Sequence, residues 1–527
     1  MPAPTQLPAV RSQWTELLEG GGEFESCLLA HVRERRWFGG KARRIRSLAV
    51  QSWFPVPGSL ECAGILLLKV EYESAASEHY QLPVALVPAA EAPALPPQFV
   101  IARLRIEDRA EECVLFDAAA SAGFANALLG GIAAGETWSG EDGALTMFAT
   151  PALGRMGDAP LLPRVSGAEH SNTAILFGDK LILKFFRRIE PGVHPDLEIG
   201  RFLSARGFAH TPALAGGLLH TGKDGVQTSL GILSQFVAGS IDAWQFTMSA
   251  LDVFFSRADK LPPSPQASQF EDAVGGIPGS VIHSMGDYAE SARLLGERTA
   301  ALHRCLASGC EDRDFSPQAV SAEGQRVCFD VMRSQTAASF RSLRDAMETL
   351  PAEMRQDAAR VLEREDQVLA SFAAAASQPP DGWDIRVHGD YHLGQVLWTG
   401  RDFLIIDFEG EPARPLAERR AKQSPLKDVA GMLRSFDYAA QAALLKSAGG
   451  MESHADYWSH WAGVIFLAAY IEGAKDCGFL PSSAAAFSAA LRAQLVAKAG
   501  YELLYELNNR PRWARIPLRG ILRLASW

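Results

Sequence analysis

The chain has 527 residues, of which 47% are hydrophobic and 21% are charged, and its formal net charge is −10. This composition excludes wholesale disorder, and the length indicates about three domains. Because the net charge is negative and no long Lys/Arg run occurs, neither nucleic acid nor an anionic membrane surface is expected as the main partner. A small-molecule substrate fits this charge balance better.

No segment of the sequence predicts a membrane span or a secretory signal. The longest apolar stretch, Trp461 to Ile471, is much shorter than the ~20 residues of a membrane helix and predicts a buried helix. The residues Met1 to Pro4 lack a basic start and an apolar run, so we expect a cytoplasmic protein. The seven cysteines are scattered without a CxxC motif, which predicts reduced thiols instead of disulfides or a zinc site.

Residues 1–97 are expected to form a small α+β unit. A helical pattern closes on the aromatic and basic segment Arg36 to Lys41. Two apolar runs bounded by Pro and Gly, Leu48 to Phe54 and Gly64 to Tyr72, then predict strands. The stretch from Ala89 to Pro97 is rich in Ala and Pro and marks the expected boundary.

Residues 98–238 are expected to form a second unit that is rich in strands. One helix interrupts the strands: it begins after His194 with Pro195 at its first position, and it ends near Gly207. Strand patterns occur at Ala174 to Phe177, Leu181 to Phe186 and Ser229 to Val237.

Residues 239–527 are expected to form a mainly helical unit, so the whole chain is predicted to have an α+β fold. The helical periodicity is clearest at Asp287 to Leu306 and at Gln335 to Ala376. The segment from Leu261 to Gly279 is rich in Pro, Ser and Gly and predicts a loop.

The most informative motif is His388 to Gln395, which is followed by Leu404 to Glu409. A phosphotransferase needs a carboxylate near the acceptor hydroxyl and oxygen ligands that hold Mg²⁺ against the β- and γ-phosphates. Asp390 as the base, with Gln395 and Asp407 as metal ligands, has the order of the kinase catalytic residues. Alone, Asp390 is equally typical of a turn. However, the end of a buried strand is a costly place for Asp407 without a metal.

Two upstream residues predict the nucleotide site. Lys184 is a lone lysine in an apolar strand, and Glu198 follows in the first turn of the predicted helix. In kinases such a lysine contacts the α- and β-phosphates of ATP and pairs with a helix glutamate. The alternative for Lys184 is an edge-strand lysine that prevents aggregation.

Further nucleotide contacts are expected on either side of Lys184. The segment that contains Ser166, Ser171 and Asn172 would cover the phosphates, although small polar residues also form ordinary turns. Gln235 and Val237 lie at the expected hinge between two lobes, where their backbone groups would contact adenine.

The acceptor site is predicted on a C-terminal helix. Lys498, Tyr501 and Tyr505 are spaced i, i+3 and i+7, which places them on one helical face. Aromatic rings on such a face cover the apolar sides of a pyranose, whereas the alternative is an amphipathic helix whose tyrosines complete the core. His392 is also assigned to the substrate site, and Glu409 is expected to serve either the metal or the sugar hydroxyls.

Three polar residues near these motifs have structural interpretations. His303 is interpreted as a core or capping histidine, and His388 is expected to orient the catalytic loop. Asp428 follows a Ser-Pro pair that opens a predicted helix, and it is expected to anchor the backbone of the loop.

These motifs resemble those of the bacterial maltokinases, which belong to the aminoglycoside-phosphotransferase branch of the protein-kinase-like fold. The resembling segments are His388 to Gln395, Ile406 to Pro412, Ser424 to Arg434, Trp37 to Lys41 for the N-terminal cap domain and Ala168 to Thr173 for the phosphate loop. The resemblance implies a bilobal kinase fold with an N-terminal cap. It also implies Mg²⁺- and ATP-dependent conversion of maltose to maltose 1-phosphate, association with trehalose synthase, and disaccharide binding by Lys498, Tyr501 and Tyr505.

Two other functions are considered. The chain is longer than a minimal maltokinase, and kinases of glucosamine and aminoglycosides share the catalytic loop, so an amino-sugar kinase is the main alternative. A cationic acceptor would need carboxylates in its pocket, whereas the predicted pocket helix offers Lys498. A catalytically silent partner of a glucan-modifying enzyme is disfavoured, because the full set of kinase residues is present: Lys184, Glu198, Asp390, Gln395 and Asp407.

Overall fold

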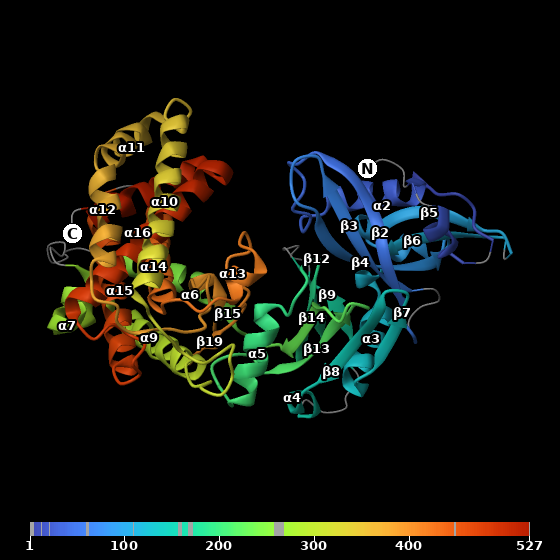
Figure 1. Ribbon diagram of the computed structural model, residues 1–527, viewed down its shortest axis with the longest axis horizontal. Coiled ribbons are helices and arrows are strands. Elements are labelled where there is room, and N and C mark those ends of the chain that lie inside the picture. Colours follow the sequence, from blue (N-terminus) through green and yellow to red (C-terminus); the bar gives the residue numbers. More distant parts are fainter. Residues whose placement is uncertain are drawn as a thin grey trace. The chain divides into compact units, whose positions relative to one another are not determined.

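The computed structural model describes residues 5–11, 13–20, 22–58, 63–108, 110–155, 161–166, 172–257, 268–446 and 450–525. The chain divides into two compact units. Unit 1 comprises Met1–Ser204 and Pro212–Ala238, and unit 2 comprises Ala205–Thr211 and Gly239–Trp527. Strands dominate unit 1 and helices dominate unit 2, which confirms the predicted α+β fold with a mainly helical C-terminal part (Figure 1).

The first sheet of unit 1, called the cap sheet here, has the strand order β1-β5-β6-β4-β3-β2, and β12 pairs with β4 (Figure 1). Its strands are β1 (Thr5–Gln6), β2 (Ile45–Pro55), β3 (Gly64–Tyr72), β4 (Glu78–Pro88), β5 (Val100–Ile106), β6 (Glu111–Asp117) and β12 (Arg188–Ile189). The sequence-based division at residue 97 falls inside this sheet. The Ala/Pro-rich stretch is a connection between β4 and β5, because β6 pairs with both strands and returns the chain to the same sheet.

The continuous apolar run of β3 is explained by burial on both faces of the cap sheet. Side chains alternate between the two faces of a strand. Ile65 and Leu67 therefore belong to a core shared with α3 (Ala122–Ala134) and the second sheet. Leu66 and Leu68 belong to a core shared with α1 (Glu16–Gly20) and α2 (Gly22–Glu34). The helices of the chain up to residue 205 are α1 (Glu16–Gly20), α2 (Gly22–Glu34), η1 (Ala92–Ala94), η2 (Pro97–Phe99), η3 (Ala118–Ala120), α3 (Ala122–Ala134), α4 (Pro151–Gly154) and α5 (Pro195–Ala205).

The second sheet of unit 1 has the strand order β7-β8-β13-β14-β11-β10-β9. Its strands are β7 (Thr137–Gly140), β8 (Gly143–Ala149), β9 (Pro163–Val165), β10 (Asn172–Phe177), β11 (Leu181–Phe186), β13 (Leu214–Thr221) and β14 (Gln227–Gln235). The neighbours β9, β10, β11 and β14 are antiparallel, and Asn172 at the start of β10 pairs with Phe186 at the end of β11.

Unit 2 is built from helices with two small sheets, β15-β18-β19 and β16-β17 (Figure 1). Its helices are α6 (Ala243–Arg257), α7 (Gln269–Gly275), α8 (Gly279–Met285), α9 (Asp287–Leu306), α10 (Ala322–Ala346), α11 (Ala352–Glu363), α12 (Glu365–Ala376), η4 (Leu393–Gln395), α13 (Leu416–Arg420), α14 (Leu426–Lys446), α15 (Glu452–Ala474), α16 (Ala484–Asn509), η5 (Pro511–Ala514) and α17 (Arg515–Ala525). Its strands are β15 (Ile241–Asp242), β16 (Gln318–Ala319), β17 (Trp383–Asp384), β18 (Val396–Trp398) and β19 (Phe403–Ile405).

The helical segment predicted at Gln335 to Ala376 consists of three helices. It starts within α10, and Pro351 separates α10 from α11 because proline has no backbone N–H to continue the helical hydrogen bonds. The apolar stretch Trp461 to Ile471 lies within α15, where most of its side chains are buried. Among the described residues, no helix is long and apolar enough to cross a membrane.

Candidate active site

Lys184 forms an ion pair with a residue of α5. Its neighbours Leu183 and Phe185 are fully buried in the core, so the alternation along β11 turns Lys184 away from that core. The ammonium Nζ lies 3.2 Å from Asp196 Oδ2 in the first turn of α5. The sequence interpretation missed Asp196, although this turn contains two acidic residues. Glu198 lies in the same turn, and its pairing with Lys184 stays a prediction.

The residues predicted to cover the phosphates flank β9 and β10. Ser166 follows β9 directly, and its N–H donates to the carbonyl oxygen of Ala174 at 2.8 Å. Asn172 is the first residue of β10, and Ser171 lies outside the described residues. The described part of this segment is therefore held by the hairpin that also supports the strand of Lys184.

The predicted adenine contacts lie at the end of β14. Gln235 is the last residue of this strand and pairs with Leu181 of β11. The Phe236 N–H donates to the carbonyl oxygen of Lys180 at 2.7 Å. Val237 follows within the last residues of unit 1, so the backbone expected to contact adenine leaves the sheet at this point.

In unit 2, Asp428 in the first turn of α14 holds the backbone of the predicted catalytic loop, His388 to Gln395. Its carboxylate accepts hydrogen bonds from the N–H groups of His388 at 2.7 Å and Gly389 at 2.9 Å, and it lies 3.0 Å from His303 Nε2. Burial opposes its ionisation, but the hydrogen bonds and the charge of His303 lower the pKa of Asp428. These contacts confirm the anchoring role of Asp428 and the core position of His303.

His388 and Gly389 shape the loop before the predicted base. His388 Nε2 lies 2.9 Å from the carbonyl oxygen of Ile406, so this nitrogen must carry the proton. Nδ1 accepts a hydrogen bond from the N–H of Asp390 at 3.4 Å. Gly389 has a φ of 87°, and a Cβ atom there would lie 3.2 Å from the Cα of Gly410. The loop therefore needs glycine at this position.

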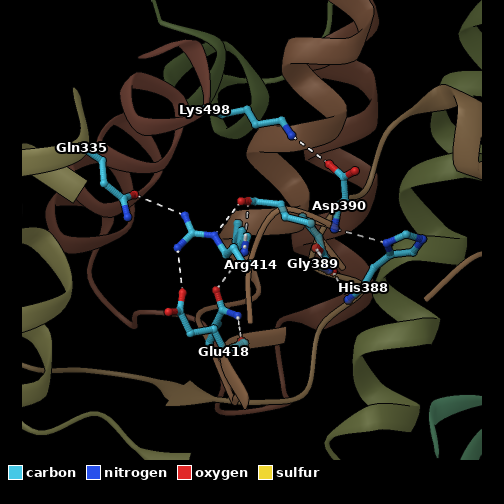
Figure 2. Close-up of polar contacts among 11 residues, drawn as sticks. Gln335, His388, Gly389, Asp390, Arg414, Glu418 and Lys498 are labelled. Atoms are coloured by element: carbon cyan, nitrogen blue, oxygen red, sulfur yellow. Dashed lines mark hydrogen bonds and ion pairs between the residues drawn. The ribbon is translucent and has the colours of Figure 1, made fainter. Parts of the chain in front are cut away.

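Asp390 faces α16, where its carboxylate accepts a hydrogen bond from Lys498 Nζ at 3.0 Å (Figure 2). Burial opposes the charge on both groups. The attraction to Lys498 outweighs burial and lowers the pKa of Asp390, while Asp390 and two further carboxylates raise the pKa of Lys498. Asp390 is therefore ionised and able to accept a proton, and Lys498 is a cation at any physiological pH.

Gln395 and Asp407, the predicted metal ligands, come from adjacent segments. The Ile406 N–H donates to the carbonyl oxygen of Gln395 at 3.0 Å, which holds the residue before Asp407 beside η4. Asp407 has a φ of 67°, a conformation that is uncommon for a non-glycine residue and is often found at functional sites. One carboxylate and one amide oxygen fit Mg²⁺, which usually takes its other ligands from water and phosphate. No group of three or more His, Cys, Asp or Glu side chains suited to a metal occurs among the described residues.

His392 and Glu409 flank this arrangement. His392 caps η4 by accepting a hydrogen bond from the Gly394 N–H at Nδ1, at 3.0 Å. Burial lowers the pKa of His392, although the charge of Asp390 opposes this effect, so the imidazole is neutral near pH 7. The backbone carbonyl of Glu409 accepts a hydrogen bond from Arg419 at 3.2 Å, and the assignment of its carboxylate to metal or sugar stays a prediction.

The two tyrosines of the predicted acceptor face of α16 are exposed. The side chains of Tyr501 and Tyr505 are 37% and 46% exposed, whereas Glu502 and Leu503 on the other side of the helix are buried. Lys498 Nζ lies 5.1 Å from the ring centre of Tyr501, which is within the range of a cation–π contact. The two tyrosine rings are therefore not part of the core.

The sequence interpretation missed a network centred on Arg414. Its Nε lies 2.6 Å from Glu411, and its other nitrogens contact Glu418 at 3.1 Å and Gln335 at 3.2 Å (Figure 2). The sequence did contain a signal for this network, because Glu411 and Glu418 lie three residues before and four residues after Arg414. No motif pointed to Gln335, because it comes from α10, about eighty residues earlier. Glu411 also contributes to the raised pKa of Lys498.

Two family models match the chain. Residues 31–120 match the Maltokinase N-terminal cap domain, and residues 272–475 match the Phosphotransferase enzyme family. The chain is 24% identical over 385 residues to a glucosamine kinase of Mycolicibacterium smegmatis, which covers 71% of this chain and 81% of that protein. It is also 24% identical over 356 residues to a glucosamine kinase of Streptacidiphilus jiangxiensis, which covers 66% of this chain and 70% of that protein.

Solved structures show a similar fold. A glucosamine kinase in complex with glucosamine, ADP and inorganic phosphate matches with a TM-score of 0.63 and 18% identity, covering 98% of this chain and 100% of that chain. A second glucosamine kinase structure, crystal form A, matches with a TM-score of 0.62 and covers 98% and 99% of the two chains. This likeness confirms the predicted kinase-like fold, with an N-terminal cap sheet and a helical C-terminal lobe.

The fold and the two family matches define a kinase of the phosphotransferase enzyme family. The phosphotransferase family match lies at residues 272–475, and the maltokinase N-terminal cap domain match lies at residues 31–120.

Proposed function

We propose that this kinase transfers the γ-phosphoryl group of magnesium ATP to the anomeric hydroxyl of maltose, which gives maltose 1-phosphate for α-glucan synthesis. The observation that carries the choice of acceptor is the ion pair between Lys498 and Asp390, with 3.0 Å between Nζ and Oδ1. A permanent ammonium beside the base offers hydrogen-bond donors to neutral hydroxyls. The same charge repels a protonated amino sugar.

Asp390 acts as the base and positions the acceptor. The sugar oxygen forms a bond to the γ-phosphorus, the bond to the bridging oxygen of ADP breaks, and the hydroxyl proton passes to Asp390. Lys498 keeps Asp390 ionised before the transfer. It also donates a hydrogen bond to a neighbouring sugar hydroxyl, which fixes the orientation of the attacking oxygen.

The donor is bound by the residues predicted for it. Lys184, held by Asp196 at 3.2 Å, contacts the α- and β-phosphates. Gln395 and Asp407 would hold Mg²⁺, which when bound neutralises charge on the β- and γ-phosphates. The contacts assigned to the phosphates and to adenine are those of Ser166, Ser171, Asn172, Glu198, Gln235 and Val237.

The sugar rings are bound by the exposed face of α16. Tyr501 lies under Lys498 and covers the ring that carries the reacting hydroxyl, and Tyr505 extends the face by one helical turn toward a second ring. An extended face of this kind favours a disaccharide over a monosaccharide. Trehalose synthase, which the resemblance implies as a partner, would supply the maltose.

A second candidate function is phosphorylation of glucosamine or another amino sugar. The similarity to proteins named glucosamine kinases over 98% of the chain favours it. A protonated amine would need a carboxylate that is not already engaged by a cation. Glu411 lies 2.6 Å from Arg414 and 3.4 Å from Lys427, which makes it a poor candidate for that role.

In the experiment, the full chain is incubated with magnesium ATP and one acceptor at a time. The acceptors are maltose, glucose, glucosamine and an aminoglycoside. Products are identified by phosphorus NMR, in which coupling of the phosphorus to the anomeric proton identifies an anomeric phosphate. Loss of the reducing end of the sugar is checked separately. We expect maltose 1-phosphate as the main product, with its formation abolished when EDTA removes Mg²⁺. Product from glucosamine alone would support the second function instead.

A further inference from the structure

Unit 1 contains a cavity of about 290 Å³ between the cap sheet and the β9–β10 hairpin. Its volume is close to the lower end of the range for small-molecule pockets, about 300–1,000 Å³. The polar and aromatic residues that line it include Arg35, Trp37, Gln98, Asp117, Thr173 and Arg187. Trp37 belongs to the aromatic and basic segment Arg36 to Lys41, for which the proposed transfer reaction provides no role.

Among the described residues, the cavity is lined by two arginines and a single carboxylate. Arg187 is only 1% exposed, and its Nη2 lies 2.6 Å from Asp117, which is also 1% exposed. Arg187 Nε donates to Thr173 Oγ1 at 2.7 Å, and Nη1 has no hydrogen-bond partner within the described part of the chain. A buried guanidinium nitrogen without a partner is costly unless a bound group satisfies it.

Arg35 supplies the second positive charge and is 8% exposed. Its Nε and Nη1 donate to the backbone carbonyls of His31 and Gln98, which satisfy hydrogen bonds but do not neutralise the charge. Its nearest carboxylate, Glu34 at 3.2 Å, is 60% exposed, so solvent weakens that pair. Together with Arg187 and Asp117, the buried side chains of the cavity carry one uncompensated positive charge.

The titration of neighbouring groups agrees with a positive potential in this cavity. Burial and the charges of Arg35 and Arg187 lower the pKa of His31 to about 3, so this histidine adds no charge at neutral pH. Burial also raises the pKa of Asp117, against the effect of Arg187. Asp117 is therefore a weak counterion for two arginines.

We propose that this cavity binds the phosphoryl group of a small anion, with Arg35 and Arg187 supplying the charge and Trp37 an apolar wall. Guanidinium groups match the geometry and charge of a phosphoryl group. The ligand is inorganic phosphate or the phosphoryl group of a sugar phosphate or nucleotide. The latter two are the product and donor classes of the proposed reaction.

The position of the cavity couples this anion to the donor site. Asn172 and Ser166, which belong to the segment predicted to cover the ATP phosphates, both line the cavity. Arg187 contacts Thr173 of β10 on one side and Asp117 at the end of β6 on the other. Binding therefore joins the cap sheet to the phosphate-covering hairpin and changes the KM for ATP.

The test measures phosphate binding by calorimetry on the full chain without acceptor. Phosphate also occupies the donor site, so the measurement uses a Lys184→Met background in which that site is weakened. We expect this variant to bind one inorganic phosphate per chain, and Arg35→Gln in the same background to weaken binding by at least tenfold, since one charged hydrogen-bonding group is lost. Arg103→Gln, an exposed arginine on β5 of the same sheet, is the matched control and should bind as the background does.

Parallel titrations with maltose 1-phosphate and ADP identify the source of the phosphoryl group. In the otherwise unchanged chain, the ligand that binds the cavity should change the KM for ATP, and Arg35→Gln should remove that change while keeping kcat.

If Arg35→Gln does not fold, Arg35→Lys, which keeps the charge but loses the planar guanidinium group, should show intermediate binding. Equal phosphate affinity with and without the Arg35 substitution, or no binding in the Lys184→Met background, would overturn the proposal. Because no acceptor is present in the binding experiment, its outcome is independent of whether maltose is the substrate.

Discussion

Lys498 Nζ lies 3.0 Å from the Asp390 carboxylate and joins α16 to the catalytic loop (Figure 2). The two residues are 108 positions apart in the chain, and both are largely buried. Each keeps the other charged in an environment that would otherwise favour the neutral forms. The predicted base and the predicted acceptor face are thereby linked by one ion pair.

Asp390→Asn should lower kcat by several orders of magnitude, because the proton acceptor and the group that positions the sugar hydroxyl are lost together. Nucleotide affinity, measured by calorimetry with magnesium ADP, should change by less than about threefold, since the donor contacts are assigned to other residues. A kcat within tenfold of the original value would exclude Asp390 as the base.

Lys498→Met should shift the acidic limb of the pH profile of kcat/KM for maltose to higher pH. In the original chain the pKa of Asp390 is lowered, so activity should fall only when the pH drops through that low value. Without Lys498, the strongest interaction that opposes burial is lost, so the pKa of Asp390 rises relative to the original chain. Lys475→Met, which removes an exposed lysine, should leave the limb in place. An unchanged limb in Lys498→Met would show that the ion pair does not set the pKa of the base.

Asp428→Asn should destabilise unit 2 by roughly 3–5 kcal/mol, because a buried acceptor of two backbone N–H groups and of His303 is replaced by a group that donates. The folded-state pKa of Asp428 is lowered, so its stabilisation is present above the unfolded pKa of about 3.9 and is lost as the pH falls. Thermal unfolding at several pH values measures both effects. The exposed Asp476→Asn should change stability by less than about 0.5 kcal/mol. Equal stability of the two variants would contradict the anchoring role.

Tyr501→Ala should raise the KM for maltose about tenfold or more while leaving the KM for ATP nearly unchanged. The exposed ring and its hydroxyl are each expected to contribute on the order of 1 kcal/mol to sugar binding. Tyr501→Phe keeps the ring and should lose only the hydroxyl part of this effect. A rise in the KM for ATP, with the KM for maltose unchanged, would place Tyr501 outside the acceptor site.

Local patterns were sufficient to predict several elements of the fold and the site. The Ser-Pro start of α14 predicted the position of Asp428 at a helix N-terminus. The i, i+3, i+7 spacing placed Lys498, Tyr501 and Tyr505 on one face of α16, and the use of this face for sugar binding stays a prediction. The extent of the cap sheet could not be predicted in this way. Its strands β5 and β6 follow a Pro-rich connection that is typical of a domain boundary, and only their pairing with β4 assigns them to that sheet.

Contacts between distant segments were also inaccessible to pattern analysis. Asp196 and Glu198 are both suitable partners for Lys184 by sequence, and the conformation of the first turn of α5 determines which contacts form. The contact of Gln335 with Arg414 depends on the packing of α10 beside the segment that contains Arg414, and a single sequence contains no signal for this packing.

The ratio of kcat/KM for maltose to kcat/KM for glucosamine tests most directly whether the Lys498–Asp390 pair defines a site for a neutral sugar. We expect a ratio of at least about ten in the original chain, which corresponds to about 1.4 kcal/mol of discrimination. Lys498→Met should lower this ratio, because the charge that repels the amino sugar is removed. A ratio below one in the original chain would contradict the proposed maltose kinase and support an amino-sugar kinase.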